Sequence, residues 1–379
     1  NFEPPALKFA IYKVVSVRNL AWKLYMLANM SWHKKLCVNH YIKSGIDHYF
    51  NSGAKTRIHG EYLRKVSGLP NEFAYKDLKT ATNRFSNVIG RGGFGSVFSG
   101  TLSDGKRVAV KRLHRADDGI DEFLAELSAL ASLNHSNLVR LHGFCTERSH
   151  YLLVFEFMEN GSLHDWLFNA DREPLDWNTR YCIALQTARG IAYLHEDSSS
   201  SRILHLDIKP HNILLDEDFN AKVADFGLAK LLNKDVSRVV TVHVRGTPGY
   251  IAPECVMEYA ITAKSDVYSY GMVLLEIVSG RRVIDRSGES EQWYLPSIAL
   301  AMLREGKLED LFDRRLHMIS TGAAEEMARA VKLALWCIQN NSALRPSMAT
   351  VLQILEGTVE ILDPPLDSYF AFGPINEEE

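Results

Sequence analysis

Residues 205–212, HLDIKPHN, place a carboxylate, an ammonium and a carboxamide within six positions, at Asp207, Lys209 and Asn212. This combination suits a loop that holds a base, a phosphate-neutralising cation and a metal-ligating oxygen around one reacting group. The same residue types are also ordinary turn residues, so the octet alone fits a surface turn equally well. The flanking sequence has to decide between these two interpretations.

A second candidate stretch carries glycines at positions 90, 92 and 95 in the pattern G-x-G-x-x-G. The dinucleotide-binding fingerprint of oxidoreductases has the same spacing, but it opens a helix within repeated βαβ units. Here the glycines are followed by SVFSGTL, a DG turn and RVAVKRL, a pattern that predicts a strand, a hairpin and a strand. Glycines between two strands form a flap whose backbone N–H groups can approach phosphates. A plain glycine-rich hairpin is the alternative.

Lys111 closes the apolar strand of this hairpin, and residues 119–133 predict a helix with an apolar stripe. A lysine in that place is usually a solvated strand end. An acid on the helix would instead hold its ammonium against nucleotide phosphates. We favour Glu126, which lies mid-helix at the edge of the stripe. Glu122 is the rival, although acids near a helix N-terminus commonly serve the helix dipole.

Strands are also predicted in NLVRLHGFC and in HYLLVFEFMENGSL, and residues 155–158 would connect a β-rich part to a helical part. The backbone there could pair with an adenine edge. An amphipathic helix is predicted over residues 177–197, shortly before the segment 205–212. Asp225 follows the strand AKVA, thirteen residues beyond Asn212. Asn212 and Asp225 therefore form a candidate metal site.

Composition sets outer limits on the function. The 379 residues are 46% hydrophobic and 23% charged, with a net charge of −3, which suggests no nucleic-acid partner. The five cysteines are odd in number, widely spread and without metal-ligand spacing. Reduced thiols in a cytosolic protein are the expected state.

Residues 1–70 differ from the remainder. They hold eleven Lys and Arg against three acids, a net charge of +8, which leaves −11 for the other residues. Charges interrupt every apolar run there, so no stretch approaches the roughly 20 residues of a spanning helix. A loosely ordered extension is favoured over an anchor to an anionic membrane surface. The chain begins at Asn1, not Met, so it is also a candidate fragment.

The sequence resembles the eukaryotic protein kinase family over roughly residues 85 to 358, because it contains the motifs of that family in the same order. The motifs are the glycine flap, VAVK, a helix Glu, H-x-D-x-x-x-x-N, DFG and APE. Four local sequences are similar to those of plant receptor-like serine/threonine kinases: LVRLHGFC, MENGSL, GTPGYIAPE and SDVYSYG. These kinases form a branch related to the Pelle and interleukin-1-receptor-associated kinases. Within that branch it most resembles the kinases of S-domain, or lectin-type, receptors.

The resemblance implies an α+β, two-lobed protein kinase fold. A small antiparallel β-rich N-lobe with one main helix would precede a larger, mainly helical C-lobe. The expected segments are a basic N-terminal extension (1–70), a lead-in helix (71–84, overlapping the helical pattern of residues 72–85), the N-lobe (85–158), the C-lobe (159–358) and a C-terminal tail (359–379).

The resemblance also implies a role for each matched residue. Asp207 would accept or orient the proton of a substrate hydroxyl, and Lys209 would neutralise the transferring phosphoryl group. A lysine at that place is the pattern of serine/threonine kinases. Lys111 would hold the nucleotide phosphates and pair with Glu126, while Asn212 and Asp225 would bind Mg²⁺, with Mn²⁺ as an alternative. ATP would be held by Ile89, Gly90, Arg91, Gly92, Gly93, Phe94, Gly95, Ser96, Val97, Ala109, Lys111, Phe155, Glu156, Met158 and Leu214.

The resemblance also implies structural roles for three residues, and the sequence departs from the family pattern at one position. Asp266 would anchor the catalytic loop, and Glu254 would pair with Arg345. The family often has Arg between the His and Asp of the catalytic loop, where this chain has Leu206. That Arg normally meets a phosphate on the activation loop. The hypothesis is therefore that activity depends little on phosphorylation of the candidate sites Ser237, Thr241 and Thr247, the last of which the family uses to contact substrate and catalytic loop.

The expected activity is transfer of the γ-phosphoryl group of ATP to protein Ser/Thr hydroxyls in receptor-like signalling. The alternative is a pseudokinase scaffold that binds nucleotide without turnover, although every phosphate- and metal-handling residue is intact. Expected partners are protein substrates, with a membrane receptor complex or anionic lipid as candidates for residues 1–70. The expected location is the cytoplasm or the cytosolic face of the plasma membrane.

Overall fold

The computed structural model describes most of the chain between residues 69 and 365. The described ranges are 69–92, 95–113, 117–131, 133–147, 150–196, 201–233, 238–240, 245–257, 260–285, 293–316 and 320–365. The predicted basic extension lies outside them except for its last two residues, as does the end of the C-terminal tail. No helix among these residues is long and apolar enough to cross a membrane.

A six-stranded sheet in the order β1-β5-β6-β4-β3-β2 forms the N-terminal lobe. All neighbouring strands are antiparallel except β1, which pairs with β5 in parallel. The strands are β1 (Asn71–Glu72), β2 (Val88–Gly92), β3 (Gly95–Thr101), β4 (Arg107–Leu113), β5 (Leu141–Cys145) and β6 (Leu152–Glu156). The predicted β-rich lobe is therefore present.

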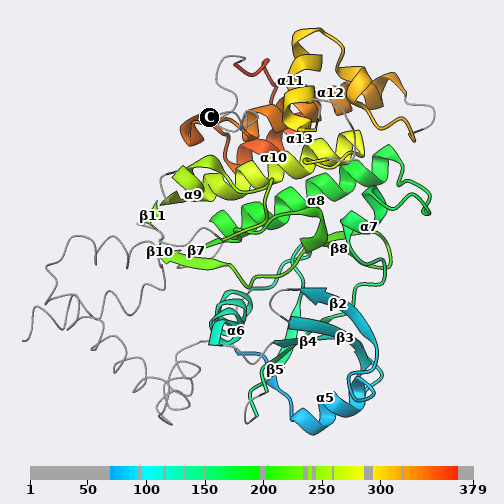
Figure 1. Ribbon diagram of the computed structural model, residues 1–379, viewed down its shortest axis with the longest axis vertical. Helices are drawn as coiled ribbons and strands as arrows, with labels where there is room; N and C mark the ends of the chain where they lie inside the picture. Colours follow the sequence, from blue (N-terminus) through cyan, green and yellow to red (C-terminus); the bar gives the residue numbers. More distant parts are fainter. Residues whose placement is uncertain are drawn as a thin grey trace, which may run out of the picture. The chain divides into compact units, whose positions relative to one another are not determined.

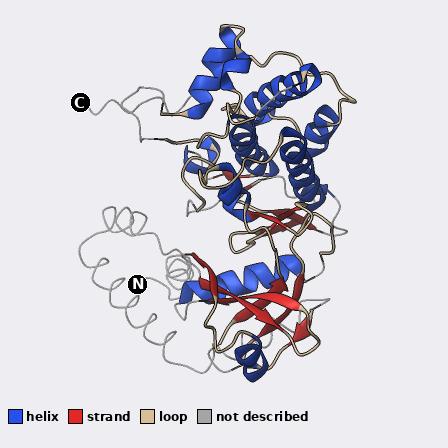
Figure 2. Cartoon of the chain, turned by 90° about the vertical axis from the view of Figure 1, so that its right-hand side faces the viewer, coloured by secondary structure: helices blue, strands red, loops and turns tan. Residues whose placement is uncertain are grey.

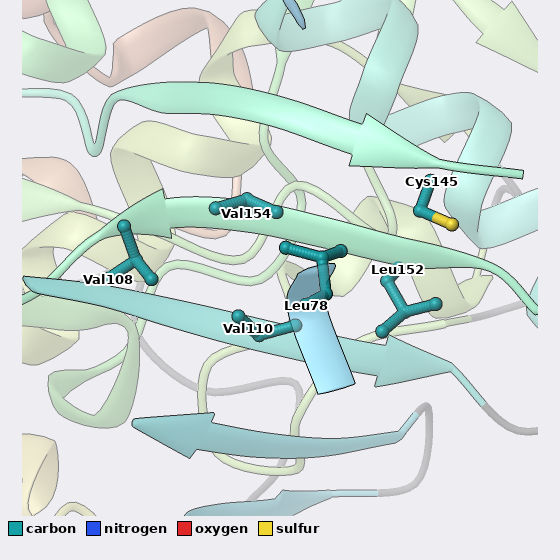
Figure 3. Close-up of a cluster of buried hydrophobic side chains, with 6 residues drawn as sticks. All are labelled: Leu78, Val108, Val110, Cys145, Leu152 and Val154. Atoms are coloured by element: carbon teal, nitrogen blue, oxygen red, sulfur yellow. The ribbon is translucent and has the colours of Figure 1, made fainter. Parts of the chain in front are cut away.

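The two faces of the sheet carry different helices, α5 (Tyr75–Ala81) and α6 (Asp117–Leu130) (Figures 1 and 2). Val108 and Val110 of β4 point toward α5, where Leu78 lies over the strands in a fully buried cluster (Figure 3). Because side chains alternate along a strand, Lys111 points to the opposite face, toward α6. The Lys111 ammonium group therefore points toward the helix that carries Glu126.

The lead-in helix is shorter than its sequence pattern, which ran from residue 72 to 85. The first residues pair with β5 instead, with Phe73 N donating to Phe144 O at 2.8 Å. After Ala81 the chain turns through three consecutive residues of positive φ, Asn83 to Phe85. Phe73 and Phe85 repeat at helical spacing, but tertiary contacts with the sheet decide the backbone at both ends.

Helix α6 carries the predicted apolar stripe. Phe123, Leu127 and Leu130 are buried, and Phe123 packs against the rings of Phe144 and Tyr151. Residues 117–122 are helical, but their side chains lie outside the described part, so the rival Glu122 is not placed. The helix is thereby fixed on the sheet with its middle turn facing β4.

The C-terminal lobe is mainly helical, with α8 and α10 side by side at its centre (Figure 1). Its helices are α7 (Leu163–Leu167), α8 (Trp177–Glu196), α9 (Pro253–Met257), α10 (Ala263–Ser279), α11 (Leu295–Arg304), α12 (Thr321–Cys337) and α13 (Met348–Leu355). Three 3-10 helices accompany them: η1 (Pro210–Asn212), η2 (Leu308–Leu311) and η3 (Ser342–Leu344). The predicted α+β architecture is confirmed.

Helix α10 is the most enclosed of these elements, because Ser265 to Ser279 are all buried. Thr262 caps its N-terminus by accepting from Lys264 N, and Gly280 ends it in the left-handed conformation. A helix that is apolar on all sides belongs in a core. Asp266 and Glu276 are its two buried acids, and both prove to hold loops of the site.

Three two-stranded sheets connect the loops of the site. They pair β7 (Ser201–Leu204) with β10 (Lys230–Asn233), β8 (Ile213–Leu215) with β9 (Ala221–Val223), and β11 (Val239–Val240) with β12 (Ala260–Ile261). The pair β8–β9 runs from just beyond Asn212 to just before Asp225. The strand AKVA predicted from the sequence thus pairs with β8 and brings the chain back to Asn212, where Ala224 N donates to Asn212 O at 2.8 Å.

Candidate active site

Asp207 lies at the centre of a closed set of hydrogen bonds. Thr247 Oγ1 donates to its Oδ1 at 2.7 Å, while Lys209 Nζ and Asn212 Nδ2 donate to Oδ2 at 2.7 and 3.0 Å. Lys209 Nζ also donates to Thr247 Oγ1 at 2.7 Å. Asp207 is only 5% exposed. Asp207, Lys209 and Asn212 of the segment 205–212 thus converge, and the Asp207 carboxylate is held in one orientation.

The backbone of this loop is fixed from below by Asp266 of α10. Its Oδ2 accepts from His205 N at 2.9 Å and its Oδ1 from Leu206 N at 2.7 Å. His195 Nε2 lies 2.8 Å from the same Oδ2. Burial would raise the pKa of Asp266, but these hydrogen bonds hold it below its ordinary value. Leu206 adopts a φ of 66°, so these bonds maintain a backbone conformation that leucine rarely takes.

His205 links the octet to the DFG stretch. Its Nδ1 accepts from Asp207 N at 3.2 Å, so its Nε2 carries the proton and donates to Ala224 O at 3.0 Å. Its ring contacts the fully buried Phe226 edge-on, with centroids 4.8 Å apart. Asp225 follows at a φ of 65°. The position of Asp225 is therefore coupled to that of Asp207 through one imidazole.

Lys111 joins the two lobes through two carboxylates. Its Nζ donates to Glu126 Oε2 at 2.8 Å and to Asp225 Oδ1 at 2.6 Å. Burial would lower the pKa of Lys111, but the two carboxylates outweigh it and raise the pKa. Burial would likewise raise the pKa of Asp225, and Lys111 instead lowers it. The lysine remains charged and Asp225 remains ionised near neutral pH.

Asn212 and Asp225 retain the oxygen atoms that a divalent cation requires. Asn212 uses its amide nitrogen on Asp207, and Asp225 uses Oδ1 on Lys111. Within the described part of the chain, neither Asn212 Oδ1 nor Asp225 Oδ2 accepts a hydrogen bond. Carboxylate and amide oxygens are the donors that hard cations such as Mg²⁺ prefer. The residues present therefore fit such an ion.

The glycine flap lies on β2 and β3, as the hairpin pattern predicts. A side chain at Gly95 would collide with the carbonyl oxygen of Arg112, so the fold itself requires that glycine. A side chain at Gly92 would meet nothing within 4 Å. The fold does not require Gly92, and its bare backbone remains open to an approaching group. Gly93 and Phe94 lie outside the described residues.

The predicted adenine-contacting residues lie on three elements. Phe155 of β6 is buried and pairs with Ala109 of β4, and Met158 is also buried. Leu214 of β8 is half-buried between two buried neighbours. The Glu156 carboxylate is engaged elsewhere, accepting from Arg140 N and Lys222 Nζ at 2.7 Å each, so only its backbone would serve a base.

The structure pairs Glu254 with Arg345, as the resemblance implies. Arg345 Nη1 and Nη2 donate to the two oxygens of Glu254, each at 2.8 Å, and Arg345 Nε donates to Gln339 O at 2.7 Å. Arg345 is 1% exposed and Glu254 7%. This is a bidentate, buried pair with its remaining donors satisfied. It attaches α9, and through it the loop that carries Thr247, to the helical lobe.

A further buried carboxylate, that of Glu276, lies beneath the loop that carries Thr247 and was not predicted from the sequence. Glu276 accepts from Tyr250 Oη at 2.9 Å and from Val283 N at 2.9 Å. Burial raises the pKa of Glu276 to about 7, despite these hydrogen bonds. The available signal was a single acid within the apolar run GMVLLEIVSG of a predicted buried helix.

The activation-loop candidates are only partly placed. Ser237 and Thr241 lie outside the described residues, whereas Thr247 bonds directly to Asp207 and Lys209. A phosphate on Thr247 would put a second anion against the Asp207 carboxylate, which electrostatics disfavours. Thr247 therefore belongs with the catalytic loop in this structure.

Comparison with known proteins agrees with this geometry. The family model described as protein kinase domain matches residues 84–355. A G-type lectin S-receptor-like serine/threonine-protein kinase of Arabidopsis thaliana, SD2-5, is 53% identical over 309 residues, which cover 81% of this chain and 37% of that protein. Another of these proteins, SD2-2, is 48% identical over 77% of this chain and 37% of its own length.

A shorter relative is covered more fully. A probable receptor-like protein kinase of Arabidopsis thaliana is 45% identical over 335 residues, which span 84% of this chain and 74% of that protein. The chain spans little more than a third of the length of the first lectin-type relatives. The similarity therefore concerns the part of those proteins that contains the motifs described above.

Proposed function

We propose a function from one premise: the chain belongs to the protein kinase family, among the receptor-like serine/threonine kinases. The fold and the family together make it a protein serine/threonine kinase, a family that uses ATP and a divalent metal. Our proposal is that it transfers the γ-phosphoryl group of Mg-ATP to Ser or Thr hydroxyls of proteins in receptor-like signalling. The observation that carries this is the closed Asp207 network together with two oxygens, Asn212 Oδ1 and Asp225 Oδ2, that accept no hydrogen bond from the described residues.

In the proposed reaction Asp207 orients the substrate hydroxyl and accepts its proton. The substrate oxygen forms a bond to the γ-phosphorus as the bond from that phosphorus to the bridging oxygen of ADP breaks. Thr247 and Asn212 already hold the carboxylate in place, so little reorganisation is needed when the hydroxyl arrives. Charge neutralisation and positioning supply the catalysis.

Lys209 would move between two anions during this cycle. Before substrate binds, its ammonium is satisfied by Asp207 and Thr247 at 2.7 Å each. Those bonds keep it beside the reacting atoms, where it would neutralise the transferring phosphoryl group. Lys111 would serve the nucleotide similarly, by exchanging its contact with Asp225 for phosphate oxygens while retaining Glu126.

A divalent metal, Mg²⁺ or in its place Mn²⁺, would be held by Asn212 Oδ1 and Asp225 Oδ2. When bound it supplies neutralisation of the charge on the nucleotide phosphates. The contribution of the protein is to keep both oxygens available, through the amide orientation of Asn212 and the Lys111 contact on Asp225 Oδ1.

The catalytic loop lacks the arginine that pairs with an activation-loop phosphate, and we propose that apolar packing replaces that pair. Leu206 packs with Val239 against a buried cluster of Leu204, Leu232 and Ile261. The cluster joins β7, β10, β11 and β12, so it attaches the chain beyond the DFG stretch to the catalytic loop without a charge. On this proposal, phosphorylation of Ser237 or Thr241 is not needed for ordering by that route.

Partners and location are proposed from the relatives. The substrates are proteins, and the place of action is the cytoplasm or the cytosolic face of the plasma membrane, within a receptor complex. For the basic residues 1–70, a contact with anionic lipid is the alternative to the favoured loosely ordered extension, at about 1 kcal/mol for each well-placed Lys or Arg. Absence of sedimentation of that segment with anionic liposomes at low salt would remove the lipid contact.

The test of the proposed activity is transfer of radiolabelled γ-phosphate from Mg-ATP to a generic protein substrate. The wild-type chain is expected to label Ser and Thr, and Asp207→Asn is expected to lower labelling by about 10²-fold or more while nucleotide still binds. Binding of nucleotide with no transfer by the wild type would support the alternative, a pseudokinase scaffold.

A further inference from the structure

A strained turn joins the lead-in helix α5 to the strands that carry the glycine flap. Asn83, Arg84 and Phe85 have φ angles of 45°, 59° and 60°, in the left-handed region that arginine and phenylalanine rarely adopt. Such a conformation persists only where the surrounding structure fixes it. Val88 then begins β2, the first strand of the flap. The turn therefore sets the direction in which the chain enters the flap.

Hydrogen bonds to the end of α5 hold the backbone of this turn. Arg84 N donates to Lys79 O at 2.7 Å, and Phe85 N donates to Thr82 Oγ1 at 3.2 Å. The Thr82 hydroxyl in turn donates to Leu78 O at 2.7 Å, and Thr82 is buried. The turn and the lead-in helix thus form one connected unit.

The ring of Phe85 fastens this unit to the sheet. It meets the Phe98 ring edge-on, with centroids 5.2 Å apart. The Arg112 guanidinium lies 4.8 Å from the ring centre of Phe85 and 4.9 Å from that of Phe98. Edge-on ring pairs and a cation over a ring face are both favourable contacts. We refer to Phe85, Phe98 and Arg112 as the Phe85 clamp. None of the roles assigned above uses it.

The Phe85 clamp lies on the face of the sheet opposite to the residues expected to hold ATP. Phe98 pairs with Val110, which points toward α5 (Figure 3). Because side chains alternate along a strand, the neighbouring residues Val97 and Lys111 point to the other face. Those two residues pair with each other across β3 and β4. Val97 adjoins Phe98 and Lys111 adjoins Arg112, so the backbone would pass a shift of the clamp directly to both.

We propose that Phe85 is a positioning residue for the nucleotide, because its clamp holds β2, β3 and β4 in the arrangement that receives ATP. This rests on the proposed kinase function. Phe85 does not touch the nucleotide, since it packs on the α5 side of the sheet. It acts through Val97 and Lys111. Without the ring, the turn would relax toward ordinary backbone angles, and β2 would begin in another direction. The lead-in helix is thereby part of the nucleotide-binding machinery.

The test measures the dissociation constant of Mg-ATP, by competition with a fluorescent ATP analogue, together with KM and kcat for transfer to a serine peptide. Phe85→Ala is expected to raise the dissociation constant and the KM for ATP by about tenfold, the ratio that one lost aromatic contact supplies. A group that supports ground-state and transition-state binding equally changes KM and spares kcat, so kcat at saturating ATP should stay within about twofold. The KM for the peptide should not change.

Matched variants separate positioning from stability. Phe85→Tyr keeps the ring and should bind ATP as the wild type does. Arg84→Gly relieves the strain at an exposed position, keeps the clamp and should also bind ATP normally. Val331→Ala alters the buried core of the helical lobe, and should lower the free energy of unfolding without changing the dissociation constant of ATP. If Phe85→Ala does not fold, Thr82→Val serves, because it removes the acceptor of Phe85 N and should weaken ATP binding in the same direction.

The outcomes distinguish this inference from the proposed function. Wild-type ATP binding by Phe85→Ala, or by Thr82→Val in its place, overturns the positioning role and leaves the kinase function standing. A fall in kcat with an unchanged dissociation constant also overturns it, because the clamp would then serve the transfer step. An equal rise in the dissociation constant of Val331→Ala overturns it too, since ATP binding would then follow stability alone. No ATP binding and no transfer by the wild-type chain overturn the kinase function itself.

Discussion

Two groups of charged pairs surround the catalytic loop. One group, which we call the face, borders the proposed reacting atoms, and the other, which we call the frame, lies buried beneath the loop. The two groups differ in whether their contacts can be exchanged. On the face, Lys209 and Lys111 hold carboxylates that a substrate or nucleotide would take over. In the frame, Asp266 and the Glu254–Arg345 pair bond to backbone or to fully enclosed partners. Face contacts can be exchanged during a reaction, and frame contacts cannot be exchanged without unfolding.

This difference separates activity from stability. When one acid of the face loses its charge, the cations keep other partners, because the Lys209 side chain is 19% exposed to solvent and Lys111 keeps Glu126. Removal of one partner of the enclosed Glu254–Arg345 pair instead leaves an uncompensated charge in the interior. Face substitutions should therefore remove transfer and spare stability. Frame substitutions should lower the free energy of unfolding first.

The largest effect is expected on the face, at Asp225. Asp225→Asn removes the carboxylate charge proposed to hold the metal, and should lower transfer about 10³-fold, equivalent to several kcal/mol of lost stabilisation. Phosphate transfer with saturating Mg²⁺ measures it, and Glu217→Gln, an exposed acid near the same hairpin, is the control. Equal losses in both variants would contradict a specific role.

The next effect is expected in the frame. Arg345→Met leaves Glu254 buried and unpaired, and should lower the free energy of unfolding by about 3–5 kcal/mol. Urea unfolding measures it. The double change Arg345→Met with Glu254→Leu removes both charges and should be less destabilising than Arg345→Met alone. Additive losses in the double variant would show that the pair is not coupled.

A smaller, pH-dependent effect is expected at Glu276. Its folded pKa of about 7 exceeds its ordinary value of 4.5, so the neutral form stabilises the fold. This stabilisation is complete below pH 4.5 and is lost as pH rises through 7, amounting to at most about 3 kcal/mol. Melting temperature should therefore fall between pH 5 and 8 more steeply in the wild type than in Glu276→Gln. Parallel profiles would place the titration elsewhere.

The smallest effect is expected in the activation loop. Ser237→Ala and Thr241→Ala should leave transfer unchanged, because Leu206 and its apolar cluster take the place of an arginine–phosphate pair. Initial transfer rates measure this. Loss of activity at either site that an acidic substitution restores would overturn the hypothesis that activity depends little on phosphorylation of the activation loop.

The sequence predicted the face and the frame in different ways. Asp207, Lys209, Asn212 and Asp225 follow from motif spacing together with the flanking sequence, whereas Asp266 and the Glu254–Arg345 pair were expected only from the family resemblance. Glu276 and His195 act across sequence separations of 26 and 71 residues, and only packing shows their partners. The lead-in helix was predicted too long, since its ends follow contacts with the sheet that helical periodicity does not encode.

The most direct test compares Asp207→Asn with Asp266→Asn by measuring both phosphate transfer and urea unfolding on each. Asp207→Asn should lose at least about 10²–10⁴-fold in transfer, the usual contribution of a general base, with nearly unchanged unfolding. Asp266→Asn should be clearly destabilised, because three donors lose a carboxylate partner. Transfer retained by Asp207→Asn, or destabilisation equal in the two variants, would contradict the division between face and frame.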